Sequence, residues 1–281
     1  MTRNTIYLNK ATVGVTDRSF FYGDGCFTTI AYRNKHLELF DRHISRLQND
    51  CEKLGISWPD WNDLVHQVTD FACAASTDCI YKIVISRGEG GRGYAPAKDC
   101  LPIAYVNSFP LPVMLIDRSV ALGIAETELI DHPRLAGVKH NNRLIQVLAK
   151  QELAALKEHG SQIDDLLLCN SSGEIIEATS ANFFYMKNNR WYTPYVNSEG
   201  VVGVMREYVL QMMCDAGQSV SKKNLSFDVL PDVQAAFLTN AVMQVTPVSS
   251  LNDDHHLYPL NLGLSRQVQR RVAETLQERH T

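Results

Sequence analysis

Several common functional signatures are missing from this sequence. It has no C-x-x-C pair, no H-E-x-x-H motif and no apolar run long enough to span a bilayer. The seven cysteines are scattered and odd in number, which fits reduced thiols better than a disulfide framework or a zinc site. His255 and His256 are adjacent in the polar stretch NDDHHLY, which favours a solvated loop over a metal pair. We therefore expect no metal site.

Charge is also unremarkable in amount and distribution. Lys and Arg total 27 against 31 Asp and Glu, and no basic stripe or block of like charge is present. The first residues, MTRNTIYLNKATV, lack the apolar core of a signal peptide. These absences predict a cytoplasmic protein with neither a nucleic acid nor a membrane as a partner.

Strand-like and helix-like runs are mixed along the chain without regular βαβ alternation, which predicts an α+β fold. Residues 26–40 indicate a hairpin around the turn-forming RNK. Asp41 is the expected N-cap of a helix that ends at Gly55, and Pro59 is expected in the first turn of a second helix. Further strands are expected at 79–86, 102–108, 120–126, 235–239 and 243–248, with several short strands between 164 and 194. Further helices are expected at about 142–158 and from about 203 and 262.

The length of 281 residues allows two medium domains. The proline-containing stretch SFPLPVMLIDRS indicates a connector. We therefore predict a smaller α+β domain over residues 1–110, a connector over 111–118 and a larger domain over 119–281, with the ligand cleft between the domains.

The stretch SRGEGGRGY contains the spacing G-x-G-x-x-G at Gly88, Gly90 and Gly93. A dinucleotide loop would have to lead from a strand into a helix. The following YAPAKDCLPIAYV has two prolines and no helical period, which argues against that helix. An ordinary surface loop is one alternative. The interpretation we favour is a substrate loop in which Arg92 presents its guanidinium to a carboxylate.

Two charged residues lie where apolar surroundings would give them unusual chemistry. Lys139 in LAGVKHNNRL lies at a junction beside Gly137, where partial desolvation would make its amine nucleophilic. A plain surface lysine is the alternative. Glu177 interrupts the apolar run of GEIIEATSANFFYM, so its carboxylate needs a partner, either an arginine or a protonated ring nitrogen.

Several segments offer groups that suit a phosphate. GVVGVMREYV leads through glycines into a helix whose first amides, at Val204 and Met205, have no intrahelical acceptor. The strand–turn–strand segment LTNAVMQVTPV brings more amides close together, and Arg46 lies on the first helix. An ordinary helix start and a solvated arginine are the alternatives. Together with Lys139 and Glu177, these groups match the requirements of pyridoxal 5'-phosphate (PLP).

The chain resembles the fold-type IV PLP enzymes over nearly its whole length. This family includes branched-chain aminotransferases, D-amino acid aminotransferases and 4-amino-4-deoxychorismate lyases, and the chain is most similar to the bacterial lyases. The segments that carry the resemblance are DRSFFYGDGCFTT (17–29), HISRL (43–47), VISRGEGGRGY (84–94), LAGVKHNNRL (135–144), EATSANFF (177–184), GVVGVMR (200–206) and TNAVMQVTPV (239–248).

The resemblance implies a two-domain fold like that of D-amino acid aminotransferase, with PLP bound in a cleft between the domains. It implies that Lys139 would hold PLP covalently and that Glu177 would pair with its ring nitrogen. Arg143 stands roughly where some relatives have a tyrosine near the phenolic oxygen, so its part in cofactor binding is open. The phosphate would be held by Arg46 and by the amides around Val204, Met205, Asn240 and Ala241.

The resemblance also implies the reaction. A dicarboxylate substrate, 4-amino-4-deoxychorismate, would give 4-aminobenzoate and pyruvate in a homodimeric enzyme. Lys139 would act as the catalytic base. Thr28 would face the substrate near Lys139 and help protonate the departing group, and Arg92 and Tyr94 would contribute to substrate recognition, often across the dimer interface. The first alternative is an aminotransferase acting on branched-chain or D-amino acids, and a PLP carrier without turnover is the second.

Overall fold

The computed structural model describes residues 5–10, 12–113, 117–253 and 255–278. The chain forms two compact units, which are described separately. Unit 1 contains Met1–Pro112 and the short segment Val138–Asn142, and unit 2 contains Val113–Gly137 and Arg143–Thr281. The expected connector over 111–118 includes residues 114–116, which lie outside the described part of the chain.

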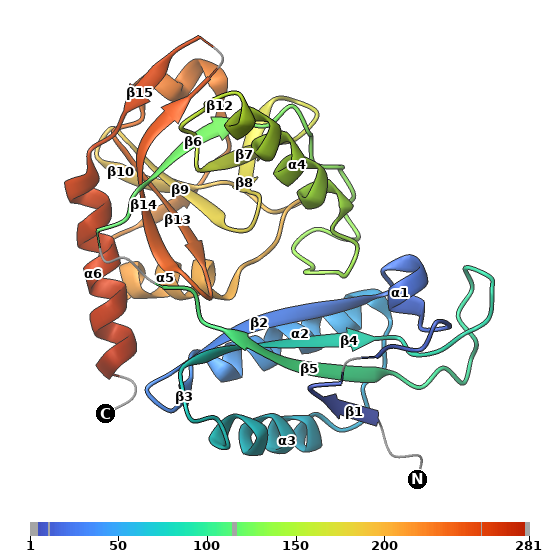
Figure 1. Ribbon diagram of the computed structural model, residues 1–281. Coiled ribbons are helices and arrows are strands. Elements are labelled where there is room, and N and C mark those ends of the chain that lie inside the picture. The colour runs from blue at the N-terminus through green and yellow to red at the C-terminus, as the bar shows by residue number, and fades with distance from the viewer. Residues whose placement is uncertain (1–4, 11, 114–116, 254, 279–281) are drawn as a thin grey trace. The chain divides into compact units, whose positions relative to one another are not determined.

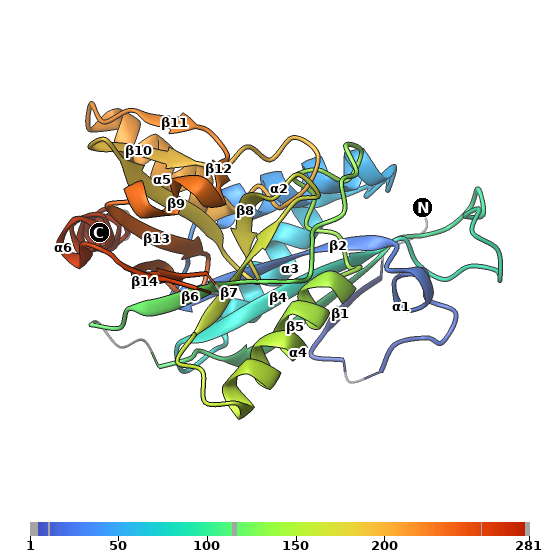
Figure 2. The same cartoon turned by 90° about the horizontal axis from the view of Figure 1, so that it is seen from above.

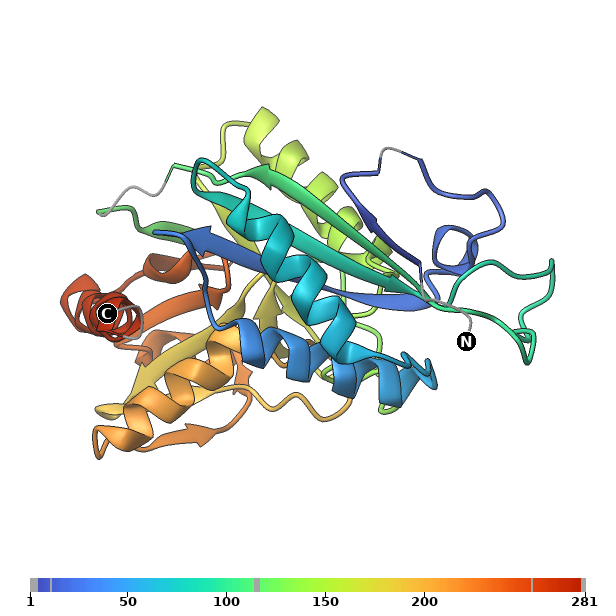
Figure 3. The same cartoon turned by 90° about the horizontal axis from the view of Figure 1, so that it is seen from below.

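Unit 1 is a five-stranded sheet in the order β1-β5-β4-β2-β3, with helices on one face. Its elements are β1 (Thr5–Leu8), α1 (Arg18–Tyr22), β2 (Gly25–Arg33), β3 (His36–Leu37), α2 (Phe40–Leu54), α3 (Trp61–Cys73), β4 (Cys79–Ser86) and β5 (Ile103–Pro110). Figure 3 shows α2 and α3 lying over the same face of β2, β4 and β5. Alternate strand residues such as Ile30 and Ile83 point into this layer and pack on Leu47 and Leu64.

Helix α2 begins earlier than its sequence indicated. The N-cap is Leu39, in a left-handed conformation with φ 53°, and Asp41 lies in the first turn instead. Asp41 was therefore the wrong prediction for the cap, because the tight β3–α2 connection fixes the helix start. Pro59 was also misplaced: α3 is capped by Asp60, whose carboxylate accepts the Asp63 N–H, so Pro59 precedes the cap.

Unit 2 is built around a ten-stranded sheet in the order β11-β10-β9-β13-β14-β6-β7-β8-β12, with β15 added to β14. A further pairing between β8 and β9, at Glu177 and Asn182, closes β9, β13, β14, β6, β7 and β8 into a barrel. Figures 1 and 2 show the curved strands, with α6 running beside β14. The elements are β6 (Val120–Ile124), α4 (Leu144–Glu158), β7 (Asp165–Cys169), β8 (Glu174–Ala178), β9 (Asn182–Lys187), β10 (Arg190–Thr193), α5 (Val204–Asp215), β11 (Val220–Lys222), β12 (Leu225–Ser226), a 3-10 turn (Phe227–Asp232), β13 (Ala235–Asn240), β14 (Gln244–Asn252), β15 (Leu257–Pro259) and α6 (Leu262–Glu278).

Side-chain alternation explains how the barrel places its polar residues. Leu167, Phe183 and Leu238 belong to the cluster that fills the barrel interior. Neighbouring residues along a strand point to opposite faces. Asn182, which precedes Phe183, and Glu177, which pairs with Leu168, therefore lie outside the barrel. Among the residues that the structure describes, no helix has both the length and the apolarity to cross a membrane.

Candidate active site

Lys139 belongs to a short segment that pairs with the edge of β2 in unit 1. The Phe27 N–H donates to the Lys139 carbonyl at 2.9 Å, and the Asn141 N–H donates to the Gly25 carbonyl at 2.8 Å. The Lys139 N–H donates to Oδ2 of the buried Asp50 on α2, at 3.1 Å. Backbone bonds therefore fix the lysine on both sides. This pairing also explains why Val138–Asn142, inside the range expected for the larger domain, groups with unit 1.

Two lysine amines approach the ring of Phe27. Nζ of Lys139 and Nζ of Lys82 each lie 4.7 Å from the ring centroid, within cation–π range. Burial lowers the pKa of the Lys82 ammonium below its ordinary value. Sequence reasoning missed Lys82, although a single lysine inside the apolar strand CIYKIVI was the available signal.

Thr28 and Arg46 are in direct contact in unit 1. Thr28 is fully buried, its hydroxyl lies 2.6 Å from Nδ1 of His43, and Nη2 of Arg46 donates to the same oxygen. Burial, with the charges of Arg46 and Lys139, holds the pKa of His43 well below its ordinary value. A neutral His43 can accept the Thr28 hydroxyl hydrogen.

Thr28 was expected to face the substrate, but its side chain is enclosed within unit 1. Thr28 pairs with Ile83 and shares its side of the sheet with α2, because alternate residues of β2 point to opposite faces. Thr29 pairs with Lys82 and therefore lies on the side of Phe27 and the two lysine amines. The sequence FTT offered two adjacent hydroxyls, and only the strand register tells them apart.

The glycine-rich loop between β4 and β5 contains no helix, which agrees with the rejection of a dinucleotide loop. Gly88 has φ +102°, and a Cβ there would lie 1.9 Å from the Leu101 carbonyl oxygen. A Cβ on Gly90 would lie 2.9 Å from Cδ of Arg18. These two glycines therefore allow close packing within the loop itself.

Helix α1 holds the glycine-rich loop by its backbone. Arg18 is buried, pairs with Asp24 at 2.8 Å, and donates to the carbonyls of Gly93 at 3.0 Å and Tyr94 at 2.6 Å. The Tyr22 hydroxyl donates to the Arg92 carbonyl at 2.5 Å. The side chains of Arg92 and Tyr94 are left exposed, the latter at 87%. A fixed backbone that presents two exposed side chains suits recognition of a ligand.

Glu177 lies on the outer face of the barrel in unit 2. It is 5% exposed and pairs across the sheet with Leu168 and Asn182. Its Oε2 accepts the Val201 N–H at 2.9 Å. Gly200, at φ +79°, lets the loop approach this closely, because a Cβ there would lie 3.3 Å from Oε2.

The predicted phosphate-binding amides of unit 2 lie at a helix start and in a turn. Helix α5 follows Gly203, which makes no side-chain cap, so the Val204 and Met205 amides stand in a first turn without intrahelical acceptors. Oδ1 of Asn240 accepts the Val242 and Met243 amides at 2.9 and 2.7 Å, which braces the turn after Ala241. Both arrangements suit an anion.

Arg206 was missed, because an arginine near a helix start is usually solvated. It is 2% exposed, its Nε donates to Thr193 at 3.4 Å and its Nη2 to the Pro194 carbonyl at 3.1 Å, and it forms an ion pair with Glu207. Burial lowers its pKa, while the carboxylates of Glu207 and Glu177 oppose that change. A positive charge therefore acts on Glu177 within unit 2.

Arg143 occupies the N-cap position of α4 in unit 2 and makes no side-chain cap. The other predicted residues divide between the units. Thr28, Arg46, Arg92, Tyr94 and Lys139 belong to unit 1, and Glu177, Val204, Met205, Asn240 and Ala241 belong to unit 2.

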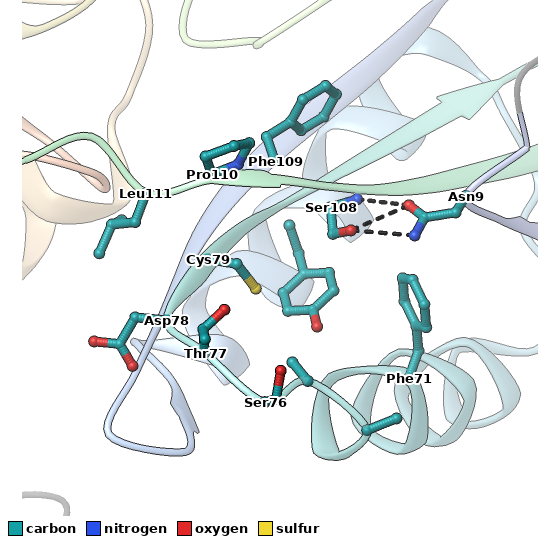
Figure 4. A pocket seen from close by; sticks show the side chains of 13 residues that line it. Asn9, Phe71, Ser76, Thr77, Asp78, Cys79, Ser108, Phe109, Pro110 and Leu111 are labelled. Atoms are coloured by element: carbon teal, nitrogen blue, oxygen red, sulfur yellow. Dashed lines mark hydrogen bonds between the residues drawn. The ribbon is translucent and has the colours of Figure 1, made fainter.

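A hollow of about 560 Å³ lies elsewhere in unit 1, at the end of α3 and the start of β4. Figure 4 shows Phe71, Asp78 and Phe109 around it, with Asn9 hydrogen-bonded to Ser108. None of the predicted site residues lines it. Among the described residues, no group of His, Cys, Asp or Glu side chains is arranged to hold a metal ion.

The family described as amino-transferase class IV matches residues 25–251, which is most of the chain. The chain belongs to the class IV aminotransferases. Its predicted fold, two-domain α+β of the fold-type IV kind, is confirmed.

Several relatives of this class IV chain are similar over almost their full length. The aminodeoxychorismate lyase of Vibrio harveyi is 36% identical, over 93% of this chain and 96% of the relative. The crystal structure of 4-amino-4-deoxychorismate lyase from Pseudomonas aeruginosa superposes with a TM-score of 0.86 and 30% identity, over 94% of this chain and 96% of that one. The D-alanine aminotransferase of Bacillus licheniformis is 24% identical, over 87% of this chain and 84% of the relative.

Proposed function

We propose that this class IV protein is a PLP-dependent lyase that converts 4-amino-4-deoxychorismate to 4-aminobenzoate and pyruvate. The observation that carries the proposal is the near full-length similarity to a lyase at 36% identity, against 24% for a D-alanine aminotransferase. The exposed Arg92 on a backbone held by Arg18 agrees with a carboxylate-bearing substrate.

The residues present fit PLP by the chemistry of their donor groups. When bound, PLP would supply an aldehyde for an amine and a ring that accepts electrons. Lys139 offers the amine, and Glu177 offers a buried carboxylate for the ring nitrogen. The phosphate would be held by Arg46 and by the amides of Val204, Met205, Asn240 and Ala241.

Lys139 would serve as the base that takes the proton from the amine-bearing carbon and returns a proton later. Its backbone is fixed by Phe27 and Asp50, so its side chain can move while its anchor stays in place. Thr29 lies on the same face of the sheet as Phe27, so its hydroxyl is better placed than that of Thr28 to assist the leaving group. Thr28 would instead position Arg46.

Two cations are assigned to the two substrate carboxylates. Arg92 would bind one of them from the substrate loop, with Tyr94 beside it. Lys82 would bind the other, because its half-buried amine lies next to the Phe27 ring that Lys139 also contacts. A carboxylate beside Lys82 would compensate for the desolvation of its ammonium group.

Glu177 would keep the ring nitrogen protonated. The Val201 N–H holds one carboxylate oxygen, and the charge of the buried Arg206 acts on the same carboxylate. We assign Arg143 to the cofactor side of the site, because it begins α4 just after the Lys139 segment.

We also propose a homodimer in the cytoplasm. All seven cysteines are free thiols, as a reducing compartment would keep them. Phe20, Phe21 and Tyr94 are exposed together at α1 and the substrate loop, which suits a contact with a second copy.

The test is to incubate purified protein and PLP with 4-amino-4-deoxychorismate and to follow 4-aminobenzoate and pyruvate. Both products should appear in equal amounts without an added keto acid. The alternative, an aminotransferase on branched-chain or D-amino acids, would need a keto acid and would yield a new amino acid. A PLP carrier would bind the cofactor and release neither product.

A further inference from the structure

Asn182 stands beside Glu177 at the point where the barrel closes. The two residues are paired across β8 and β9, and Asn182 is also paired with Thr239 on β13. Side chains of directly paired residues leave the sheet on the same face. Asn182 is 5% exposed, so its amide must find its hydrogen-bond partners within the protein.

The amide of Asn182 contacts the loop before α5 at two points. Nδ2 donates to the Val201 carbonyl at 2.7 Å. On its other side, Oδ1 lies so close to Gly203 that a Cβ there would be only 2.1 Å away. One side chain therefore sets the position of the segment that leads from Val201 to the N-cap of α5.

The backbone of Val201, through its two adjoining peptide groups, connects this amide to the carboxylate of Glu177. Its carbonyl accepts from Asn182, and its N–H donates to Oε2 of Glu177 at 2.9 Å. Gly137 holds the opposite edges of the same two peptide groups, since it donates to the Gly200 carbonyl at 3.0 Å and accepts from the Val202 N–H at 3.1 Å. A shift of the Val201 backbone would therefore move its N–H away from Glu177.

We propose that Asn182 is a positioning residue for Glu177: by holding the backbone of Val201, it fixes the Glu177 carboxylate in the orientation that serves the ring nitrogen of the cofactor. This inference rests on the proposed PLP function. It also accounts for the residue type. An aspartate would set a second carboxylate opposite Glu177 and an acceptor against the Val201 carbonyl, and a leucine would leave that buried carbonyl without its donor.

The test compares Asn182→Ala and the isosteric Asn182→Asp with Asn252→Ala. The control removes a similar bond from the same unit, because Nδ2 of Asn252 donates to the Leu122 carbonyl at 3.0 Å, on strands distant in sequence from Glu177. We measure the PLP dissociation constant of each apoprotein, the pH dependence of the bound cofactor's absorbance and the melting temperature. The pH titration reports protonation of the cofactor, which a general loss of stability would not shift.

Both Asn182 variants should bind PLP about 10- to 50-fold more weakly, the effect of losing a well-placed hydrogen bond. The pH midpoint of their cofactor absorbance should also shift. Asn252→Ala should lose melting temperature yet retain wild-type PLP affinity and midpoint. If folded Asn182→Ala or Asn182→Asp showed the same PLP affinity and absorbance midpoint as the unmutated protein, the inference alone would be overturned. If the unmutated protein bound no PLP, the proposed function would be overturned as well.

Discussion

Arg87 connects three parts of unit 1, and its removal should measurably destabilise the protein. Its Nε donates to both oxygens of Asp24, at 3.0 and 2.8 Å. Its Nη2 and Nη1 donate to the carbonyls of Leu54 and Gly55, each at 2.7 Å. These carbonyls end α2, where backbone acceptors lack intrahelical donors and a positive charge is favourable.

Arg87→Ala should cost about 2–4 kcal/mol of unfolding free energy. Each hydrogen bond to a charged group is worth about 1.5–3 kcal/mol, but the contributions are not additive. Asp24 also retains Arg18 at 2.8 Å, so the loss stays below the full cost of an isolated buried charge. At about 2–3 °C per kcal/mol for a chain of this size, the melting temperature should fall by about 4–12 °C.

The assay is thermal unfolding of the apoprotein, followed by circular dichroism at several pH values. Burial raises the pKa of Asp24, but the hydrogen bonds and charges of Arg87 and Arg18 lower it by more. The pKa of Asp24 therefore lies below its ordinary value of 3.8. The stabilisation from the Asp24 pair is present above that value and lost as pH falls through the lower folded pKa, whereas the bonds to the Leu54 and Gly55 carbonyls do not titrate. The difference between the variant and wild type should therefore narrow in acid without vanishing.

Arg92→Ala is the matched control, since it removes the same charge from the same loop at an exposed side chain. It should melt like the wild type. If Arg87→Ala also melts within about 1 °C of wild type at neutral pH, the bonds described above contribute no net stability and the reasoning is refuted.

Three further predictions concern the site, and a fourth concerns Glu199 in unit 2. Lys139→Ala should abolish turnover and the covalent link to PLP, tested by borohydride reduction and mass analysis; a reduced adduct on another lysine would contradict the assignment. Glu177→Gln should bind PLP but react several powers of ten more slowly, since each pKa unit lost at the ring nitrogen is worth about 1.4 kcal/mol; near-normal turnover would exclude the role. Arg92→Ala should lower kcat/KM about 10- to 100-fold, because a charge-assisted contact is worth about 1.5–3 kcal/mol, and PLP affinity should not change; release of PLP with an unchanged KM would instead indicate a phosphate loop. Burial raises the pKa of Glu199, as do the charges of Asp131 and Glu174, against a hydrogen bond from Asn170. Glu199→Gln should therefore have the melting temperature of wild type below pH about 4.5 and a higher melting temperature than wild type at neutral pH. An equal difference in melting temperature at both pH values would argue against this.

The sequence predicted the elements well where a pattern is local. The strand at 79–86 has the expected bounds, and the helix ending at Gly55 ends there with that residue in the left-handed conformation. The cap at Leu39 could not be predicted, because no propensity favours leucine in that conformation. Its position follows from the short β3–α2 connection, which is a property of the folded chain.

The site was less accessible to sequence reasoning, because orientation depends on register. Thr28 and Thr29 are chemically equal in the sequence, and only the pairing with Ile83 and Lys82 assigns each to a face. Arg206 looks like an ordinary surface charge until its burial is known, whereas Lys82 interrupts an apolar strand and could have been named. Lys139 and Glu177 could be named because a charged residue in an apolar run is unusual by itself.

The pairing of Val138–Asn142 with β2 has a consequence for the order in which the protein can be completed during synthesis. Residues 1–112 leave the ribosome first, but the Gly25 carbonyl and the Phe27 N–H acquire their partners only when residues 139–141 follow. Until then the nascent sheet carries an open edge, which is the kind of edge that pairs with foreign strands. A fragment ending at residue 112 would keep that edge permanently, so a gene cut at this boundary would yield an aggregation-prone product rather than an independent domain.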